Sequence, residues 1–401
     1  MATQAGVGLS SATDTAQAAR EAAGTALKRA GVERADWGVI FATFPHRPRY
    51  AAALAETQKR LGTDLITGCS AWGVLTGSEE IEGKAAIAVL AVRSDRIRGD
   101  ALFAPAGDDD GEGAAREIGR RVAGSSGGGL LALWPDPFAL RLDLVLEGVG
   151  RQAPGVAVIG AAASGDPRLK QTFQFHGRNV ATRGLAGLHL GGECRHVVGI
   201  TQGCQPLGDP CRVTRGEGNV LHELDGEPAL EVLRRRLPPI LRDSIERLGA
   251  HLFVGLPPDP QQDRFEPGEY LVRHMIGADP ESGALVVGGS IRTGEPVLLV
   301  LREAQAARED LKRMLARLAP APGGTPYQFG FYFNCAARGT SLHGLPGIDT
   351  AYISGSLPDL PIIGFFGNAE IAPLRGENRL FTHTGVLALC AEEAAPRSDG
   401  A

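Results

Sequence analysis

Apolar residues recur at helical spacing in several separate stretches of the chain. Near the start, alanines at every third or fourth position predict a helix that ends at Gly31, with Thr13 or Asp14 as its N-terminal cap. The same period returns further along, and the proline pair Pro238–Pro239 is expected to break or kink the fourth of the later helices. These later helices are predicted at 50–61, 114–122, 138–147, 227–248 and 304–318.

Short runs of β-branched and aromatic residues lie between the predicted helices. Fifty-five glycines against 3 methionines also favour many tight turns, because glycine is costly inside helices and strands. The mixture predicts an α/β (α+β) fold with mixed β-sheets flanked by helices and many short strands. Strands are expected at 37–43, 84–92, 130–134, 156–161, 172–175, 185–190, 197–202, 252–256, 271–276, 284–287, 297–301, 328–335, 362–366 and 380–390.

A cluster of turn formers, GCQPLGDPC, divides the pattern near residue 202. Its position predicts two lobes, at 7–202 and 203–391. The last residues, 392–401, are polar and are expected to be disordered.

Charge and composition narrow the range of functions. A net charge of −5 offers no basic footprint for nucleic acid. No window approaches the ~20 apolar residues that span a bilayer, and the N-terminus lacks the basic and apolar regions of a secretory signal. Six scattered cysteines fit reduced thiols better than a disulfide framework. We therefore expect a cytoplasmic protein that binds neither membrane nor nucleic acid.

Histidines and cysteines gather between residues 189 and 211 without forming a recognisable metal motif. The segment holds His189, Cys194, His196, Cys204 and Cys211, but no CxxC pair. No metal site is therefore predicted. The chain also lacks the phosphate-binding GxxxxGK[ST], the GxSxG nucleophile elbow and the HExxH zinc motif. These absences make an enzyme of a familiar class the less favoured interpretation.

Four blocks together resemble the FIST family. They are GVGLSSATD with TGCSAWGVLTGSEEIEG, then GVAVIGAAASGD with QTFQFHGRNVATRG, then QGCQPLGDPCRVTRGEGNV, and last FYFNCAARGTSLHG with PIIGFFGNAEIAP and LFTHTGVLAL. The blocks run from about residue 7 to 390 in the family's order, so the resemblance covers both its N- and C-terminal halves. It implies a small-ligand-binding protein of intracellular signal transduction, with amino acids as proposed ligands, a protein signalling partner, and haem as a cofactor in some members.

The run FGFYFNCAARG carries the first candidate site residues. As a strand it places Phe333 and Cys335 on one face and Asn334 on the other, with Arg338 at the strand's exit. Arg338 suits two roles. Its planar fork could clamp a ligand carboxylate, or it could be a structural arginine paired with an acid.

The run PIIGFFGNAEIAP carries a second set. Gly364 and Gly367 make room for another backbone or for a ligand, and Asn368 offers both a donor and an acceptor. Glu370 could meet a ligand ammonium group or pair with Arg338. A site that holds both an arginine and a glutamate beside aromatic side chains would suit an amino acid.

The leading prediction joins these runs with two turns in one cleft between the lobes. The full set of predicted ligand-binding residues is Gly68, Cys69, Ser70, Gly203, Cys204, Asn334, Cys335, Arg338, Gly364, Phe365, Gly367, Asn368, Glu370 and His383.

Three alternatives remain open at this point. His383, on an apolar face of the last predicted strand, could be an axial ligand of a haem in a nitric oxide sensor, although His176, His189 and His196 are also candidates. Cys335 could be the nucleophile of a thiol enzyme if His383 lay beside it. The chain could also be an adaptor that recruits proteins. The sequence does not select the ligand, the partner or the oligomeric state.

Overall fold

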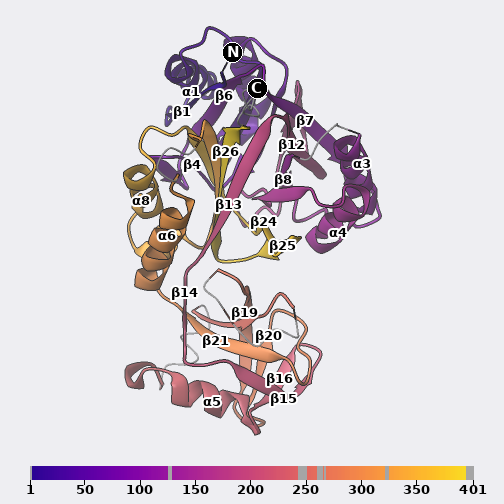
Figure 1. Ribbon diagram of the computed structural model, residues 1–401, viewed down its shortest axis with the longest axis vertical. Helices are drawn as coiled ribbons and strands as arrows, with labels where there is room; N and C mark the ends of the chain where they lie inside the picture. The colour runs from indigo at the N-terminus through magenta and orange to yellow at the C-terminus, as the bar shows by residue number, and fades with distance from the viewer. Residues whose placement is uncertain are drawn as a thin grey trace, which may run out of the picture. The chain divides into compact units, whose positions relative to one another are not determined.

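The computed structural model describes residues 2–124, 129–242, 251–259, 265, 268–320 and 325–393, and it divides the chain into two compact units. The first comprises Met1–Ile200, Arg313–Leu380 and Thr384–Ala401. The second comprises Thr201–Lys312 with Phe381–His383. Figure 1 shows the elements of both.

The first unit repeats one sequence of elements three times. The first repeat consists of β1 (Gln4–Ser10), α1 (Thr15–Ala30), β2 (Trp37–Thr43), α2 (Tyr50–Leu61), β3 (Ile66–Ala71), a hairpin of β4 (Gly73–Thr76) and β5 (Glu80–Glu82), and β6 (Ile87–Arg93). A short 3-10 helix, Phe44–Arg49, precedes α2.

The second and third repeats follow the same order. The second consists of β7 (Ile97–Pro105), α3 (Glu112–Ala123), β8 (Leu130–Pro135), α4 (Leu142–Gln152), β9 (Ala157–Ala161), a hairpin of β10 (Gln174–His176) and β11 (Asn179–Ala181), and β12 (Gly184–Gly192). The third consists of β13 (Cys194–Gln202), α6 (Ala304–Leu318), β22 (Phe329–Cys335), α7 (Gly339–His343), α8 (Ile348–Ser356), β23 (Ile362–Gly367), a hairpin of β24 (Glu370–Leu374) and β25 (Glu377–Phe381), and β26 (Thr384–Glu392).

Each repeat contributes four strands to one sheet, and its hairpin pairs with the strands of a different sheet. The three sheets run β1-β6-β2-β3-β10-β11, β7-β12-β8-β9-β24-β25 and β13-β26-β22-β23-β4-β5. The first repeat's hairpin therefore completes the third sheet, the second repeat's hairpin completes the first sheet, and the third repeat's hairpin completes the second sheet. This exchange closes a cycle, so no repeat completes its own sheet.

A glycine at the same position of each repeat permits close pairing of the two inner strands. A Cβ atom on Gly68 would lie 1.7 Å from the Ile40 carbonyl oxygen, and one on Gly364 would lie 1.7 Å from that of Tyr332. Gly160 is the equivalent residue in β9, beside Leu133. The register at these glycines makes Phe41, Trp134 and Phe333 equivalent residues.

Helices cover one face of the sheets, and aromatic rings fill the space at the other. Small alanines of α1, such as Ala22, pack with Ile40 of β2 in one apolar cluster. The opposite face of β2 carries Phe41, whose ring lies 5.5 Å from that of Trp134 in the second sheet and 4.6 Å from that of Phe365 in the third. The aromatic core thus lies where the three sheets meet.

The second unit is a six-stranded antiparallel barrel. Its strands pair in the order β21-β15-β16-β20-β19-β18, and β18 closes the ring on β21. Val213, Val254 and Leu299 belong to the cluster that fills it. By connectivity the barrel is an insertion between β13 and α6. Its elements are β14 (Cys204–Pro206), β15 (Cys211–Glu217), β16 (Val220–Leu224), β17 (Glu227–Pro228), α5 (Ala229–Arg236), β18 (Leu252–Leu256), β19 (Leu271–Asp279), β20 (Ala284–Val287) and β21 (Pro296–Arg302).

The mixed α/β fold with many short strands is confirmed, and so are several helices. Asp14 caps α1 by accepting a hydrogen bond from the Gln17 backbone N–H (2.7 Å), and Gly31 ends the helix with a φ of 68°. The helix predicted at 138–147 begins later than expected, because Asp136 accepts hydrogen bonds in a turn there and α4 begins at Leu142.

The predicted break at the proline pair is confirmed, and two details of the longer predictions were wrong. The helix predicted at 227–248 begins with strand β17 and continues as α5, which ends at Arg236, just ahead of Pro238. Residues 243–248 lie outside the described residues. The strand predicted at 380–390 is broken at His383, whose φ of 58° places it in the turn between β25 and β26.

The predicted division of the sequence and the compact units differ. The chain leaves the first unit after Ile200, close to the predicted lobe boundary, but residues 313–380 pack with the first unit. β26 runs to Glu392, the first residue of the predicted tail, and residues 394–401 lie outside the described residues.

Candidate functional site

Strand β22 carries polar side chains on one face and aromatic side chains on the other. Phe331 and Phe333 stack with their ring centroids 6.0 Å apart. Tyr332 and Asn334 point the other way, and both donate hydrogen bonds to Asp349 of α8. The alternation predicted from the sequence is therefore confirmed. It places two buried polar groups next to the exit of the strand.

The carboxylate of Asp349 is the centre of a buried polar cluster. Its Oδ2 atom accepts from Tyr332 Oη (2.8 Å), Asn334 Nδ2 (3.1 Å) and Arg338 Nη2 (3.1 Å). Its Oδ1 atom lies 3.1 Å from His343 Nε2. We call these five residues the Asp349 cluster. Arg338 is the only fully buried arginine among the described residues, and its charge is balanced by Asp349.

The pKa values within the cluster follow from burial and from this ion pair. Burial opposes ionisation of Asp349, but the Arg338 guanidinium and the His343 hydrogen bond together hold the pKa of Asp349 below its ordinary value. Burial, followed by the negative charge of Asp349, raises the pKa of Tyr332. Within the cluster, the Arg338 guanidinium thus faces an ionised Asp349 and the phenol of Tyr332 stays neutral.

Glu370 forms a second buried polar group, beside Cys335. Its side chain is fully buried, its Oε2 atom accepts from the Thr384 backbone N–H (3.2 Å), and the Cys335 thiol hydrogen-bonds to its carboxyl group. Burial raises the pKa of Glu370 well above its ordinary value, against the opposing hydrogen bonds and the charge of Arg338. Arg338 therefore acts electrostatically on both carboxyl groups. It donates hydrogen bonds to Asp349.

Three buried polar atoms around Arg338 are unsatisfied. Asn334 Oδ1, His343 Nδ1 and Glu370 Oε1 receive no hydrogen bond from an N–H or O–H group of the described residues. A buried polar atom without a partner costs about 1–3 kcal/mol, so its retention calls for an explanation. One explanation that fits these acceptors is a bound molecule that donates hydrogen bonds to them.

Two glutamates of β5 hold the segment that carries His343 and Asp349 of the cluster. Glu82 accepts from Thr340 at both the backbone N–H (2.9 Å) and the hydroxyl (2.8 Å). Glu80 accepts from the Gly347 backbone N–H and from the Thr350 hydroxyl. Burial, partly offset by the Gly347 hydrogen bond, raises the pKa of Glu80 to about 7. The hairpin of the first repeat is thus hydrogen-bonded to residues 340–350 of the third repeat.

Most residues of the predicted glycine-rich segments lie in strands β3 and β23 or directly after them. Ser70 Oγ donates to the Ser164 carbonyl oxygen (2.9 Å), and Asn368 Nδ2 donates to the Ala163 carbonyl oxygen (3.0 Å). A Cβ atom on Gly367 would lie 2.5 Å from that of Ala161. The chain segments at the ends of β3, β9 and β23 therefore contact one another. Neighbouring residues occupy the space that a side chain would need at Gly364 and Gly367. Gly68, Cys69 and Phe365 are buried strand residues of the same region.

Three predicted site residues belong to the second unit. Gly203 accepts from the Glu303 backbone N–H (3.0 Å), and Cys204 begins β14 as a buried member of an apolar cluster with Phe253. The His383 ring lies 4.4 Å from that of Phe253 and 6.2 Å from that of His274. His383 thus packs against aromatic side chains of the second unit.

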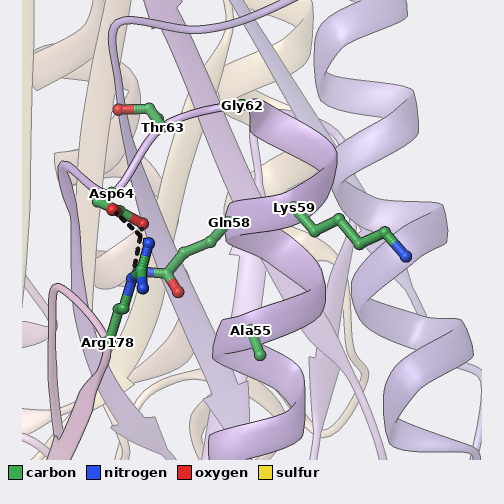
Figure 2. Close-up of a pocket in the computed structure, with 7 residues that line it drawn as sticks. All are labelled: Ala55, Gln58, Lys59, Gly62, Thr63, Asp64 and Arg178. Carbon is green, nitrogen blue, oxygen red and sulfur yellow. Dashed lines mark hydrogen bonds and ion pairs between the residues drawn. The ribbon is translucent and has the colours of Figure 1, made fainter.

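Two surface pockets lie away from the predicted residues. One, of about 470 Å³, is lined by Asp64, Arg178 and the end of α2. Figure 2 shows Arg178 facing Asp64, while Lys59 points away from them. The other, of about 730 Å³, is lined by Arg29, Asp359 and Tyr327 among others. The Arg178–Asp64 pair neutralises itself at an exposed surface, so the buried cluster has the more distinctive chemistry.

The sequence indicated Asn334, Arg338 and Glu370 but missed their partners. Asp349 and His343 lie in short helices without a clear period, and Glu80 lies in a strand of only 3 residues. The available signal was an acidic residue, Asp349, that follows Arg338 at a short distance in the sequence. No group of three or more potential metal ligands occurs among the described residues. Within the same ranges, no helix is both long enough and apolar enough to cross a bilayer.

Comparison with known families matches both halves of the chain. The FIST N domain matches residues 36–227, and the FIST C domain matches residues 229–373. These matches cover most of the chain, including the third repeat as far as Pro373.

Similar proteins occur in bacteria and plants. An uncharacterized protein of Mycobacterium tuberculosis is 32% identical over 384 residues, covering 96% of this chain and 98% of that protein. One of Mycobacterium bovis is 29% identical over 395 residues, covering 97% and 99%. An Arabidopsis thaliana F-box/LRR-repeat protein is 29% identical over 178 residues, covering 41% of this chain and 32% of the plant protein.

Proposed function

The chain belongs to the FIST family, and on that premise we propose that it is a sensory protein whose ligand is an amino acid or a similar small carboxylate. FIST domains are associated with small-ligand-binding signal transduction. The proposed site lies at the exits of β22 and β23 in the first unit, around Asn334, Arg338 and Glu370.

The observation that carries the proposal is the set of unsatisfied buried acceptors beside a buried arginine. Asn334 Oδ1 and Glu370 Oε1 lack an N–H or O–H partner among the described residues. A ligand ammonium group supplies three donors, and the guanidinium charge of Arg338 favours a carboxylate.

Charge balance favours a zwitterion over an anion or a cation. The ion pair of Arg338 with Asp349 is neutral overall, and burial favours the neutral form of Glu370. A ligand with a net charge would leave that charge uncompensated in a buried site, which is costly. An α-amino acid adds one charge of each sign.

Entry of a ligand requires the segment 339–347 to move, because Asn334, Arg338 and Glu370 are fully buried. The segment is short, and glycines with positive φ lie at both ends, Gly339 (42°) and Gly347 (79°). Its attachment to Glu80 and Glu82 defines a closed state. Ligand binding shifts the population of such a state only if the ligand has different affinities for the closed and open forms.

Signalling also needs a receiver, and we include a protein partner in the proposal. The plant relative, of which the match covers 32%, is named an F-box/LRR-repeat protein. Six free cysteines support a reducing, cytoplasmic location.

Calorimetric titration of the full chain with the twenty amino acids tests the proposal. We expect at least one to bind, and Glu370→Gln to weaken it about 10–100-fold, because the amide turns a donor toward the ligand ammonium group. Arg29→Ala, in the 730 Å³ pocket, is the control and should leave the affinity unchanged. Absence of binding by every amino acid would reject this ligand class.

A further inference from the structure

Two cysteines lie near the same end of two neighbouring strands of the third sheet. Cys194 is the first residue of β13, and Cys390 lies near the end of β26. β13 and β26 are adjacent in the sheet. Just beyond the pair, the Glu393 backbone N–H donates to the Glu193 carbonyl oxygen (2.8 Å). Interaction with the Cys194 side chain, followed by burial, raises the pKa of Cys390, and the Cys194 thiol donates a hydrogen bond to the carbonyl oxygen of Arg195 (4.0 Å).

A second interaction pins the same strand ends independently. The Arg96 guanidinium pairs with Glu193, which precedes Cys194, and its Nη1 atom donates to Glu392 (2.9 Å), which follows Cys390 by two residues. The strand ends that carry the two cysteines are thus held together by a backbone hydrogen bond and by an ion-pair bridge. Strain-free disulfides need this proximity of the two strands.

The pair differs from the other thiols in its access to solvent. Cys194 is partly exposed, whereas the remaining five of the chain's six cysteines, all of them in the described residues, are buried. Cys335 interacts with Glu370, and Cys211 with Asp225. An oxidant in solution therefore reaches Cys194 first, with a second thiol already in contact.

We propose that Cys194 and Cys390 form an oxidation-sensitive pair that closes reversibly to a disulfide in the presence of a peroxide. Hydrogen peroxide oxidises the Cys194 thiol to a sulfenic acid and releases one water. The Cys390 sulfur then attacks the sulfenic sulfur, so that the S–S bond forms and the S–O bond breaks. The oxygen leaves as a second water with the proton of Cys390. The two thiols lose two electrons, and a dithiol reductant returns them.

The crosslink would fix the strand by which the chain enters the second unit. β13 is the edge strand of its sheet, and the second unit begins at Thr201 within it. β26 begins at Thr384, directly after Phe381–His383 of the second unit. Edge strands held by hydrogen bonds on one side open more readily than central strands. Oxidation therefore makes β13 more resistant to opening than it is in the reduced protein.

Peptide mapping of the oxidised full chain tests the pair. The reduced protein is treated with hydrogen peroxide, free thiols are blocked, and the digest is analysed by mass spectrometry. We expect a linked peptide that contains Cys194 and Cys390, lost on reduction, and an upward shift of the melting temperature. Cys194→Ser and Cys390→Ser should each abolish both effects, while Cys211→Ser retains them.

Three contrary results would each overturn the proposal. One is Cys390 blocked as a free thiol while Cys194 is found as a sulfinic acid. The others are a linkage of Cys194 to another cysteine, or to a second copy of the chain on a non-reducing gel. For a variant that folds poorly, the oxidised wild-type chain is unfolded and its blocked thiols are counted: two fewer than in the reduced chain supports the pair, and an equal count contradicts it.

Discussion

Arg338 and Asp349, both fully buried, are joined by a 3.1 Å contact between Nη2 and Oδ2, and Asp349 also binds Tyr332, Asn334 and His343. The short helix α7 and its following turn separate the two residues in sequence. Their pairing neutralises the most deeply buried arginine of the described chain and fixes the exit of β22. This pair is therefore the structural basis of the proposed site.

Asp349→Asn should destabilise the protein strongly. The change leaves the Arg338 charge buried without its counter-ion, and breaking a buried pair in this way costs about 3–5 kcal/mol. The free energy of unfolding, measured by urea titration, gives the effect. Asp64→Asn breaks the pair with Arg178, whose two side chains are 58% and 77% exposed. That control should change little, and equal losses from the two variants would contradict the account.

Glu80 should make stability depend on pH near neutrality. Because the folded-state pKa is raised to about 7 from an ordinary 4.5, the contribution of Glu80 to the free energy of unfolding is fully present below pH 4.5 and is lost as pH rises through about 7. The free energy of unfolding of the wild type should therefore fall by about 1–2 kcal/mol between pH 5 and pH 8, after allowance for solvent screening. Glu80→Gln should remove this fall. The measurement is urea unfolding at both pH values.

Glu79→Gln is the matched control for this pH dependence, since Glu79 is the exposed neighbour of Glu80. The control should keep the wild-type difference between pH 5 and pH 8. If Glu80→Gln also keeps it, the carboxyl group of Glu80 is not the source.

The exchange of hairpins predicts that the halves of the sequence do not fold separately. β4 pairs with β23 through Val74 and Phe365, and β24 pairs with β9 through Glu370 and Ala161. A fragment of residues 1–202 lacks these partners and should show no cooperative unfolding by circular dichroism. Residues 201–312 contain a closed barrel with its own apolar cluster and should unfold cooperatively alone. The reverse pattern would contradict the description of the repeats.

Much of the site was predictable because local alternation determined it. The period of two in β22 separated Tyr332 and Asn334 from Phe331 and Phe333, and Arg338 fell at the strand's exit. Asp349 was not predictable, because its role depends on how α8 folds back on β22. The pairing of Val74 with Phe365 joins residues far apart in sequence, and no local pattern encodes it.

The repeats leave only a weak trace in the sequence. Segments 177–190 and 376–389 both begin with Gly-x-Asn, and both contain a threonine followed by a residue with positive φ, Arg183 (59°) or His383 (58°). The likeness is limited to turns because the strands need only apolar side chains of suitable size. An internal comparison of these segments would have corrected the strand predicted across His383.

Amino-acid binding should leave Glu370 protonated. Burial raises the pKa of Glu370 well above its ordinary value, so the free site holds this group neutral, and a zwitterionic ligand adds no net charge that would favour its ionised form. Affinity should therefore stay unchanged between pH 6 and pH 8, and calorimetry in buffers of different ionisation enthalpy should detect no proton release. Proton release by the wild type that is absent from Glu370→Gln would contradict a neutral Glu370.

The most direct measurement is a crystal structure of the protein grown with the tightest-binding amino acid. We predict ligand density at the exits of β22 and β23, with the ammonium group within hydrogen-bond distance of Glu370 Oε1 or Asn334 Oδ1. The segment 339–347 should close over it. Density in the pocket of Arg29 and Asp359 instead, with Asn334 and Glu370 unchanged, would contradict the central claim.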